Sequence, residues 1–304
     1  MAKGLSDSPR GSLLGTTMST QINKLGLIAG NGRFPFLVLD EAVRRSIPVT
    51  VAAIKEETSP DIEEVFKPEQ GVEIHWVGLG QLGKLLRLFR KSGVDKAIMA
   101  GQVKHNRIFS REQPLSVSRI AATVPDLTML RLLMSLPSKN TQALIGAIAD
   151  VLAQNGIELL DSTCLVRHLL APSGVLTRRK PTDDETRNIG YGREIAREIA
   201  RLDIGQTVVI KDQAVVAVEA MEGTDETIRR AARLAGSRPL TVVKVSRPRQ
   251  DMRFDVPVIG TQSLAVFGEC LVSALALDAG KTLIFDRPEF TEAADRLNMT
   301  IVAE

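Results

Sequence analysis

The chain has 304 residues, of which 44% are hydrophobic, and its 39 Lys and Arg exceed its 36 Asp and Glu by only three. This length predicts two domains, and the small, scattered basic excess argues against a nucleic-acid-binding surface. The chain has only two cysteines, Cys164 and Cys270, which excludes a disulfide framework or a zinc cluster and predicts a reduced, cytoplasmic setting.

Residues 1–22 are predicted to be a disordered tail, because Ser, Gly and Thr stand where a signal peptide would have a sustained apolar region. The folded part begins with an apolar strand at 24–30, which leads through Asn31 and Gly32 into a helix from about Pro35 to Arg45. Gly30 and Gly32 permit close backbone approach, so the first amides of this helix could bind a phosphate or a nucleoside. Pro35 replaces the third glycine of the G-x-G-x-x-G pattern, which weakens the dinucleotide interpretation and leaves a tight turn as the alternative.

Strands and helices continue to alternate through the N-terminal half. Strands are predicted at 49–54, 72–79 and 96–100, and helices at 82–91, 128–136 and 142–154. The alternation predicts a Rossmann-like α/β domain over residues 23–170 with a mostly parallel sheet. Gly101 and Gln102 follow the strand at 96–100, and such sheets bind ligands beyond the carboxyl ends of their strands. We therefore expect both residues in a binding site.

Residues 171–188 are rich in proline, glycine and mixed charge, which predicts a linker. Residues 189–304 are predicted to form a second α/β domain, separated from the first by a ligand cleft. Its expected elements are a helix at 190–202, a hairpin of strands at 207–210 and 214–218, a strand at 240–245, a helix at 263–277, a strand at 282–285, a helix at 288–297 and a strand at 299–302.

The hairpin delivers an acidic turn at residues 219–226 to the start of a helix. Gly223 permits a tight turn, and Thr224 or Asp225 can cap the helix. Carboxylates there either complement the helix dipole or hold a cation that binds a phosphate, and an ordinary capped helix is the alternative. Further along, Asp255 lies between Phe254 and Val256, so its burial would require a compensating cation or hydrogen-bond donor.

Four blocks of the sequence resemble the UDP-2,3-diacylglucosamine pyrophosphatases of the LpxI type. They read KLGLIAG at 24–30, RLDIGQ at 201–206, VEAMEGTD at 218–225 and RFDVPVIG at 253–260. The resemblance covers nearly everything from residue 24 to residue 304. It implies a cytoplasmic hydrolase of lipid A biosynthesis that splits UDP-2,3-diacylglucosamine into UMP and 2,3-diacylglucosamine 1-phosphate (lipid X). It also implies a divalent cation, Mg²⁺ (or Mn²⁺), and a lipid held between two domains.

The resemblance further implies site residues. Asp255 matches the family's essential aspartate, and Gly223, Thr224 and Asp225 match its Glu-Gly-Thr-Asp turn. We expect Asp255 to be a metal ligand or a water-orienting base, with Asp225 and Glu222 as supporting metal ligands. Substrate contacts are expected from Gly30, Asn31, Gly32, Gly101, Gln102, Glu222, Gly223, Thr224, Lys244, Arg247, Arg253, Gly260 and Thr261, with the three basic side chains neutralising phosphate oxygens.

The chain departs from the family pattern where Gln102 replaces an asparagine, and where Asn140, Thr141 and Gln142 replace an acidic pair. The second change removes negative charge and bears on rate and substrate detail. We expect a homodimer peripheral to the inner membrane, with no nucleic-acid partner. Two other interpretations stay open: a nucleotide-binding oxidoreductase that uses Gly30 and Gly32, and a non-catalytic lipid- or nucleotide-binding protein.

Overall fold

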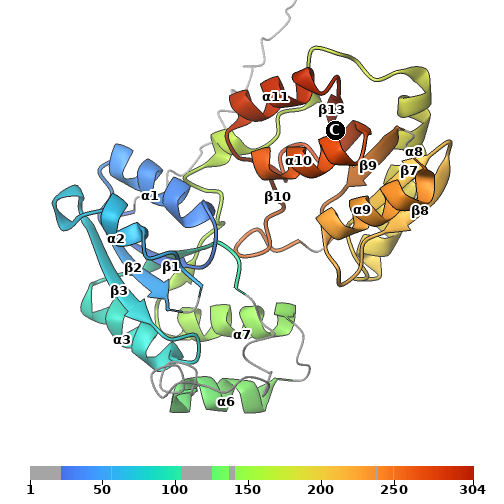
Figure 1. Ribbon diagram of the computed structural model, residues 1–304. Helices are drawn as coiled ribbons and strands as arrows, with labels where there is room; N and C mark the ends of the chain where they lie inside the picture. Colours follow the sequence, from blue (N-terminus) through green and yellow to red (C-terminus); the bar gives the residue numbers. More distant parts are fainter. Residues whose placement is uncertain (1–21, 56, 104–124, 137–140, 237–238, 249) are drawn as a thin grey trace, which may run out of the picture.

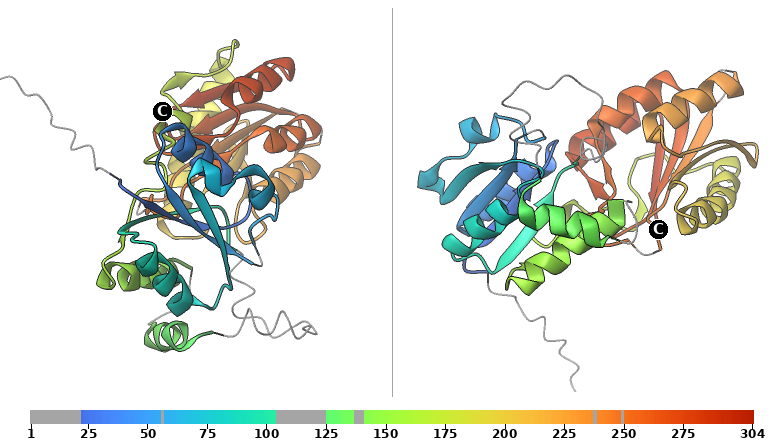
Figure 2. Two further views of the ribbon diagram at one scale, coloured as in Figure 1. Left: turned by 90° about the vertical axis from the view of Figure 1, so that its left-hand side faces the viewer. Right: turned by 90° about the horizontal axis from the view of Figure 1, so that it is seen from below.

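The computed structural model describes residues 22–55, 57–103, 125–136, 141–236, 239–248 and 250–304. Apart from Ile22, the predicted tail lies outside these residues, as does Asn140. The described chain forms two α/β lobes (Figures 1 and 2). None of the helices in the described ranges is both long and apolar enough to cross a membrane.

The N-terminal lobe is built on a parallel sheet of five strands in the order β3-β2-β1-β4-β5. The strands are β1 (Leu25–Ala29), β2 (Val49–Ile54), β3 (Val72–Val77), β4 (Lys96–Ala100) and β5 (Glu158–Leu159). Every residue of β1 and β2 is buried, as expected for parallel strands covered on both faces. This confirms the predicted Rossmann-like domain.

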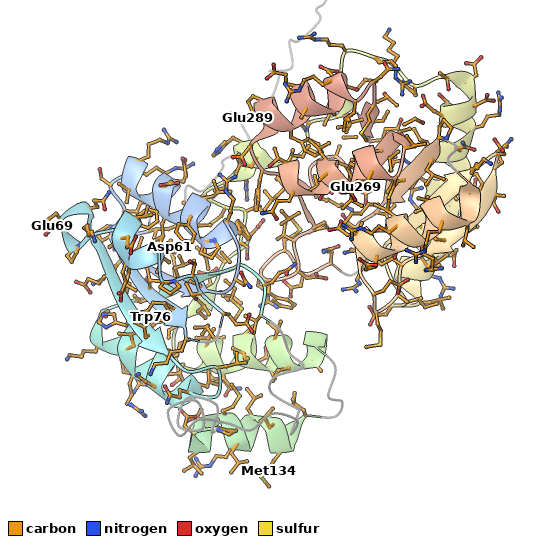
Figure 3. All side chains as sticks on the ribbon, viewed as in Figure 1. Asp61, Glu69, Trp76, Met134, Glu269 and Glu289 are labelled. Atoms are coloured by element: carbon orange, nitrogen blue, oxygen red, sulfur yellow. The ribbon has the colours of Figure 1, made fainter. Side chains whose placement is uncertain are left out.

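Helices cover both faces of this sheet. They are α1 (Phe34–Arg44), α2 (Ile62–Val65), α3 (Leu82–Lys91), α6 (Leu127–Ser135) and α7 (Thr141–Gln154), with a 3₁₀ helix at Pro68–Gln70. The helices α1 and α2 pack into one core cluster, and α3, α6 and α7 pack into another. On α6 the buried Met129 and Leu132 face the core, whereas Met134 projects outward (Figure 3).

The C-terminal lobe holds a mixed sheet of six strands in the order β6-β13-β11-β9-β7-β8. These are β6 (Gly174–Val175), β7 (Thr207–Lys211), β8 (Ala214–Val218), β9 (Leu240–Lys244), β11 (Val272–Leu277) and β13 (Thr300–Ala303). A separate parallel pair joins β10 (Val258–Ile259) to β12 (Leu283–Ile284). The predicted hairpin is present as the antiparallel pair β7–β8.

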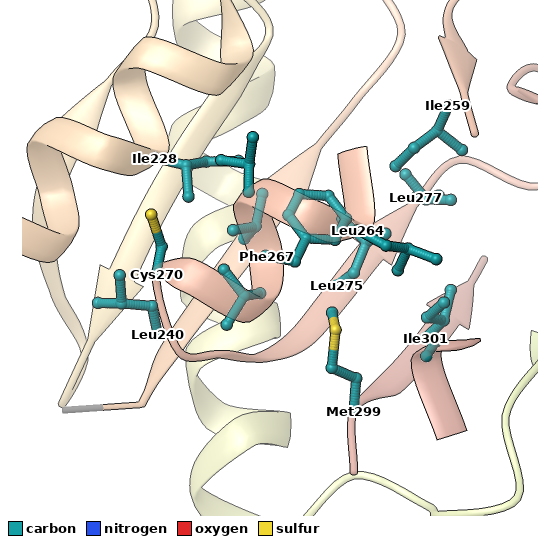
Figure 4. Packing of buried hydrophobic residues seen from close by; sticks show 14 of the residues in the cluster. Ile228, Leu240, Ile259, Leu264, Phe267, Cys270, Leu275, Leu277, Met299 and Ile301 are labelled. Carbon is teal, nitrogen blue, oxygen red and sulfur yellow. The ribbon is translucent and has the colours of Figure 1, made fainter. Parts of the chain in front are cut away.

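The helices of this lobe are α8 (Asp183–Arg201), α9 (Thr224–Ala235), α10 (Thr261–Glu269) and α11 (Arg287–Arg296), with a 3₁₀ helix at Arg167–Leu169 in the connection from the first lobe. The helix α8 packs against one face of the sheet. The other three helices pack against the opposite face, where Ile228, Leu264, Phe267 and Leu275 meet (Figure 4).

The predicted helix at 263–277 is wrong beyond residue 269. The helix α10 ends at Glu269, Leu271 takes a positive φ of 53°, and β11 begins at Val272. Five of the six residues of β11 are buried, so the strand lacks the polar alternation that marks a half-exposed strand. Its alanines and leucines also favour a helix, and only the pairing with β9 and β13 decides for a strand.

The segment 171–188, predicted as a linker, instead belongs largely to the C-terminal lobe. β6 pairs with β13, and α8 begins at Asp183, seven residues before the predicted start at 190. A capping box fixes this start, because the Thr182 Oγ1 accepts a hydrogen bond from the Glu185 N–H and the Glu185 carboxylate accepts one from the Thr182 N–H. The chain crosses between lobes just before this segment, at residues 160–170.

The two lobes are packed against each other at this crossing. Leu283 and Phe285 of the C-terminal lobe join the core cluster of α1, and the rings of Phe34 and Phe285 lie 5.9 Å apart. The buried Ser162 Oγ lies 2.6 Å from the carbonyl oxygens of both Met99 in β4 and Arg253 in the C-terminal lobe. These contacts hold the strand ends of the two lobes around a shared pocket.

Candidate functional site

A pocket of 770 Å³ lies between the lobes, beyond the carboxyl ends of β1, β4 and β9. The N-terminal lobe lines it with Asn31, Gly32, Arg33, Phe34, Gly101 and Gln102. The C-terminal lobe lines it with Gln206, residues 222–226, Val242, Lys244, residues 255–263, Phe267, Leu275, Phe285 and Asp286. Most residues predicted to contact a substrate therefore surround one cavity, at the sheet edge where α/β proteins bind ligands.

Backbone contacts shape the wall from the N-terminal lobe. Asn31 and Gln102 form an antiparallel bridge with N···O distances of 2.7 and 3.0 Å. Gly30 is not part of the lining, but a Cβ there would lie 2.5 Å from the Gln102 carbonyl oxygen. Gly101 has a φ of +94°, and a Cβ there would lie 2.6 Å from the Asn31 carbonyl oxygen. Both glycines are thus required for the close approach of the two loops.

Besides α11, whose N-cap is the acidic Asp286, three helices begin at the pocket, and none of the four has a side-chain cap. The N-cap residues are Arg33 for α1, Gly223 for α9 and Gly260 for α10. Uncapped N-termini leave backbone N–H groups and a partial positive charge available for an anion. The prediction that Thr224 or Asp225 caps α9 is wrong, because Gly223 occupies the N-cap position.

The Thr224 hydroxyl joins a buried polar chain instead. Lys244 Nζ donates to Thr224 Oγ1 at 2.8 Å, and Thr224 Oγ1 donates to Glu219 Oε1 at 2.8 Å. Glu219 is only 7% exposed, and its other carboxylate oxygen accepts from the Gln206 N–H. Burial lowers the pKa of Lys244, whereas the carboxylates of Glu219, Asp225 and Asp255 act in the opposite direction. This series of hydrogen bonds fixes the Lys244 ammonium group at the pocket wall.

Glu222 and Asp225 differ in their partners. The Glu222 carboxylate accepts from Arg230 Nη2 at 2.6 Å and from the Ala220 N–H at 3.1 Å. Its pKa lies below the ordinary value because of a hydrogen bond from its own N–H and then because of Arg230. Asp225 lines the same pocket, and its carboxylate accepts no hydrogen bond from any described residue. Asp225 is therefore the freer carboxylate, and Glu222 shapes the turn.

Asp255 is half-buried and paired with a cation. Arg247 Nη1 donates to Asp255 Oδ2 at 3.1 Å. The Gln250 side chain links the two residues again, since its oxygen accepts from the Arg247 N–H at 2.6 Å and its nitrogen donates to the Asp255 carbonyl. Arg247 thus supplies the compensation that partial burial of a carboxylate requires.

Two predicted phosphate-binding arginines lie outside the pocket lining. Arg253 forms an ion pair with Asp251 at 2.6 Å, with its guanidinium 5.9 Å from the centre of the Phe254 ring. Arg247 lines a second, smaller pocket. In their place, Arg33 reaches across the lobes to an ion pair with Asp286. The sequence prediction did not include Arg33 or Gln206 as site residues and placed Glu219 only within the acidic turn, although Glu219 stands in a family-like block at the end of an apolar strand.

A magnesium ion fits only part of the predicted ligand set. Within the described ranges, no group of three or more His, Cys, Asp or Glu side chains is placed to hold a metal ion. Asp255, Asp225 and Glu222 are thus not gathered into one cluster, and Glu222 already has two partners. Asp225 and Asp255 both line the pocket, and Mg²⁺ commonly takes one or two protein carboxylates together with water and substrate phosphates.

The fold and the site define a two-domain α/β protein whose interdomain pocket is rich in helix N-termini. The family model "LpxI N-terminal domain" matches residues 24–169, and "LpxI C-terminal domain" matches residues 172–302. With both domains matched in order, the chain belongs to the LpxI family. It is 29% identical over 291 residues to "UDP-2,3-diacylglucosamine pyrophosphatase LpxI" of Caulobacter vibrioides, across 92% of this chain and 97% of that protein.

Similarity to solved structures is weak. A leucoanthocyanidin reductase–NADPH complex from Vitis vinifera has a TM-score of 0.25 at 14% identity, over 44% of this chain and 47% of that chain. The biotin carboxylase subunit of pyruvate carboxylase has a TM-score of 0.23 at 13% identity, over 71% of this chain and 42% of that chain. TM-scores this far below 0.5 carry no argument about fold or function.

Proposed function

We propose that this protein hydrolyses the pyrophosphate bond of UDP-2,3-diacylglucosamine to UMP and 2,3-diacylglucosamine 1-phosphate in lipid A biosynthesis. Membership of the LpxI family and the name of the C. vibrioides relative support this reaction. The observation that carries the proposal is the meeting of three uncapped helix N-termini with Lys244 and two carboxylates, Asp225 and Asp255, in one pocket.

The uncapped helices suit a ligand with two adjoining phosphates. α9 and α10 begin in the same lobe and open into the same pocket, so each can offer N–H groups to one phosphate. Lys244 lies at the end of β9 with its ammonium group held by Thr224. In the proposed complex Lys244 neutralises a non-bridging oxygen, where negative charge increases as the anhydride bond breaks.

In the proposed reaction, the carboxylates of Asp225 and Asp255 act on the attacking water and on the metal ion. Asp255 accepts a hydrogen bond from the attacking water and takes its proton, as the new oxygen–phosphorus bond forms and the bridging bond breaks. Asp225 and Asp255 would hold Mg²⁺ (or Mn²⁺), which when bound neutralises charge on the phosphate oxygens. An unpaired Asp225 would otherwise repel a pyrophosphate, so a cation between them is consistent with the site.

Another part of the lining is apolar. Phe34, Phe267, Leu275 and Phe285 come from both lobes and border the pocket. We assign this side to the diacylglucosamine part of the substrate, because apolar side chains favour removal of acyl surface from water. A cytoplasmic location, contact with the inner membrane and a homodimer remain predictions that accompany this substrate.

The direct test is incubation of the purified protein with UDP-2,3-diacylglucosamine and Mg²⁺, scored for UMP. UMP release should stop in excess EDTA and return with Mg²⁺ or Mn²⁺, whereas Ca²⁺, with longer and looser coordination, should support it poorly. Turnover that persists in excess chelator would remove the metal from the proposal. Lipid binding without UMP release under any metal condition would identify a non-catalytic binding protein.

A further inference from the structure

A second pocket of 370 Å³ lies where the chain crosses between the lobes. Three separate segments line it: the crossing segment with Asp161, Thr163, Arg167 and Leu170, the loop after β9 with Arg247, Pro248, Gln250 and Met252, and the turn after β11 with Gly280 and Lys281. We propose that this pocket binds a phosphate group, carried by inorganic phosphate or by a phosphomonoester, and that its occupancy acts on Asp255 through Arg247.

The charges in this pocket favour an anion. Arg167, Arg247 and Lys281 bring three cationic groups to the lining, against the single carboxylate of Asp161. That carboxylate is already engaged, because its Oδ1 accepts from both the N–H and the hydroxyl of Thr163 at 2.7 Å. Arg167 and Lys281 are exposed, and in the part of the chain that the structure describes neither side chain forms an ion pair. A phosphate dianion offers these cations the charge-assisted hydrogen bonds that they lack.

Arg247 connects this pocket to the first one. Its guanidinium lies 3.1 Å from Asp255 Oδ2 and 3.2 Å from Asp203 Oδ1. Arg247 also lines the second pocket, whereas Asp255 lines the first. A phosphate in the second pocket therefore competes with Asp255 for one guanidinium group. The Gln250 side chain, bonded to the backbone of both residues, keeps them within one short loop.

Because Asp255 and a bound phosphate share Arg247, phosphate binding should lower the rate of turnover. When Arg247 turns toward a bound phosphate, Asp255 loses the donor that orients its carboxylate, so turnover falls without direct competition with the substrate. The binding site itself does not depend on the proposed reaction. Only its effect on rate rests on that proposed function, whose products are both phosphomonoesters.

The binding test uses calorimetric titration of the full-length protein with inorganic phosphate, and separately with UMP. The variant Arg167→Gln/Lys281→Gln should weaken phosphate binding by about tenfold or more, because charge-assisted hydrogen bonds are lost. Arg87→Gln/Lys91→Gln removes the same net charge from exposed positions on α3 and should leave binding unchanged. Lys244→Met, in the first pocket, should preserve the phosphate site. UMP binding that persists in Lys244→Met and falls in Arg167→Gln/Lys281→Gln would extend the site to phosphomonoesters.

Equal phosphate affinity of the wild type and Arg167→Gln/Lys281→Gln would overturn the proposal, as would complete loss of phosphate binding in Lys244→Met. For the effect on rate, phosphate should lower kcat of UMP release in the wild type, and this inhibition should disappear in Arg167→Gln/Lys281→Gln while its basal rate stays unchanged. Purely competitive inhibition in both proteins would contradict the role of Arg247. If the wild type releases no UMP at all, the proposed reaction fails, and the calorimetric titration alone decides whether the phosphate site exists.

Discussion

The two walls of the interdomain pocket are made in different ways. The N-terminal lobe contributes mainly backbone, since its loops approach closely at Gly30 and Gly101 and display Asn31 and Gln102. The C-terminal lobe contributes a connected set of charged side chains around Lys244. The first wall therefore sets the shape of the pocket and the second sets its electrostatics. Substitutions can alter these two properties separately.

The largest effect is expected from Asp255→Asn in the charged wall. The amide retains the size of the carboxylate but cannot take a proton from water, so kcat for UMP release should fall by about 10²- to 10⁴-fold. Substrate binding should persist. Asp251→Asn is the matched control, because this aspartate lies in the same loop but pairs with Arg253 outside the pocket lining. Wild-type UMP release by Asp255→Asn would assign the chemistry to another residue.

The backbone wall should respond to Gly101→Ala. The added Cβ would meet the Asn31 carbonyl oxygen at 2.6 Å, at a φ of +94°, so we expect a loss of about 1–3 kcal/mol in the free energy of unfolding. KM should rise as the loops separate. Gly93→Ala also has a positive φ, of +70°, but its Cβ would meet nothing within 4 Å. The free energy of unfolding, measured with denaturant, should therefore be lower for Gly101→Ala than for Gly93→Ala. The reverse order would contradict the close approach of the two loops.

A smaller effect should follow from Glu219→Gln. Burial lowers the pKa of Lys244 and the Glu219 carboxylate opposes this change, so loss of the carboxylate should lower that pKa further. Because the protonated amine binds phosphate, the alkaline limb of kcat/KM against pH should move to lower pH. Glu226→Gln, an exposed position paired with Arg229, should leave the limb in place. A limb that moves to higher pH would exclude Lys244 as the titrating group.

The smallest effect is expected from Glu41→Gln, where charge in the N-terminal lobe serves stability. A hydrogen bond from Arg44 is the first cause that lowers the pKa of Glu41 from 4.5 to about 2. The folded state thus holds this carboxylate ionised more strongly than the unfolded state. Its contribution should be present above about pH 4.5 and lost as pH falls toward 2.

Denaturant midpoints of wild type and Glu41→Gln should accordingly differ at pH 7 and converge near pH 2, with turnover unchanged at pH 7. Glu292→Gln, an exposed pair with Arg296, is the control for loss of one surface charge. A difference between wild type and Glu41→Gln that persists at pH 2 would point to packing instead of charge.

The sequence predicted elements best where amphipathic pattern and sheet order agree. The helix at 82–91 and the strand at 96–100 match α3 and β4 at both ends. β11 was missed because a strand buried on both faces carries no alternation, so its pairing partners, distant in sequence, decide its conformation.

The site was predictable in composition but not in the direction of its side chains. Asp255, Thr224 and Lys244 line the pocket as expected. Arg253 stands in the same family-like block as Asp255, yet the carboxylate of Asp251 holds it elsewhere. Such local competition between partners depends on loop geometry, which the order of residues does not specify.

Ser162 has a mechanical consequence for any motion of the lobes. Its one hydroxyl hydrogen serves two carbonyl groups, Met99 in the first lobe and Arg253 in the second, and its N–H donates to Met252 in the second lobe. Separation at this point would leave a part-buried carbonyl without a donor, which costs up to roughly 1–3 kcal/mol. Any opening of the lobes should therefore be a hinge rotation with its axis near Ser162. The rim of the pocket farthest from Ser162 should move most.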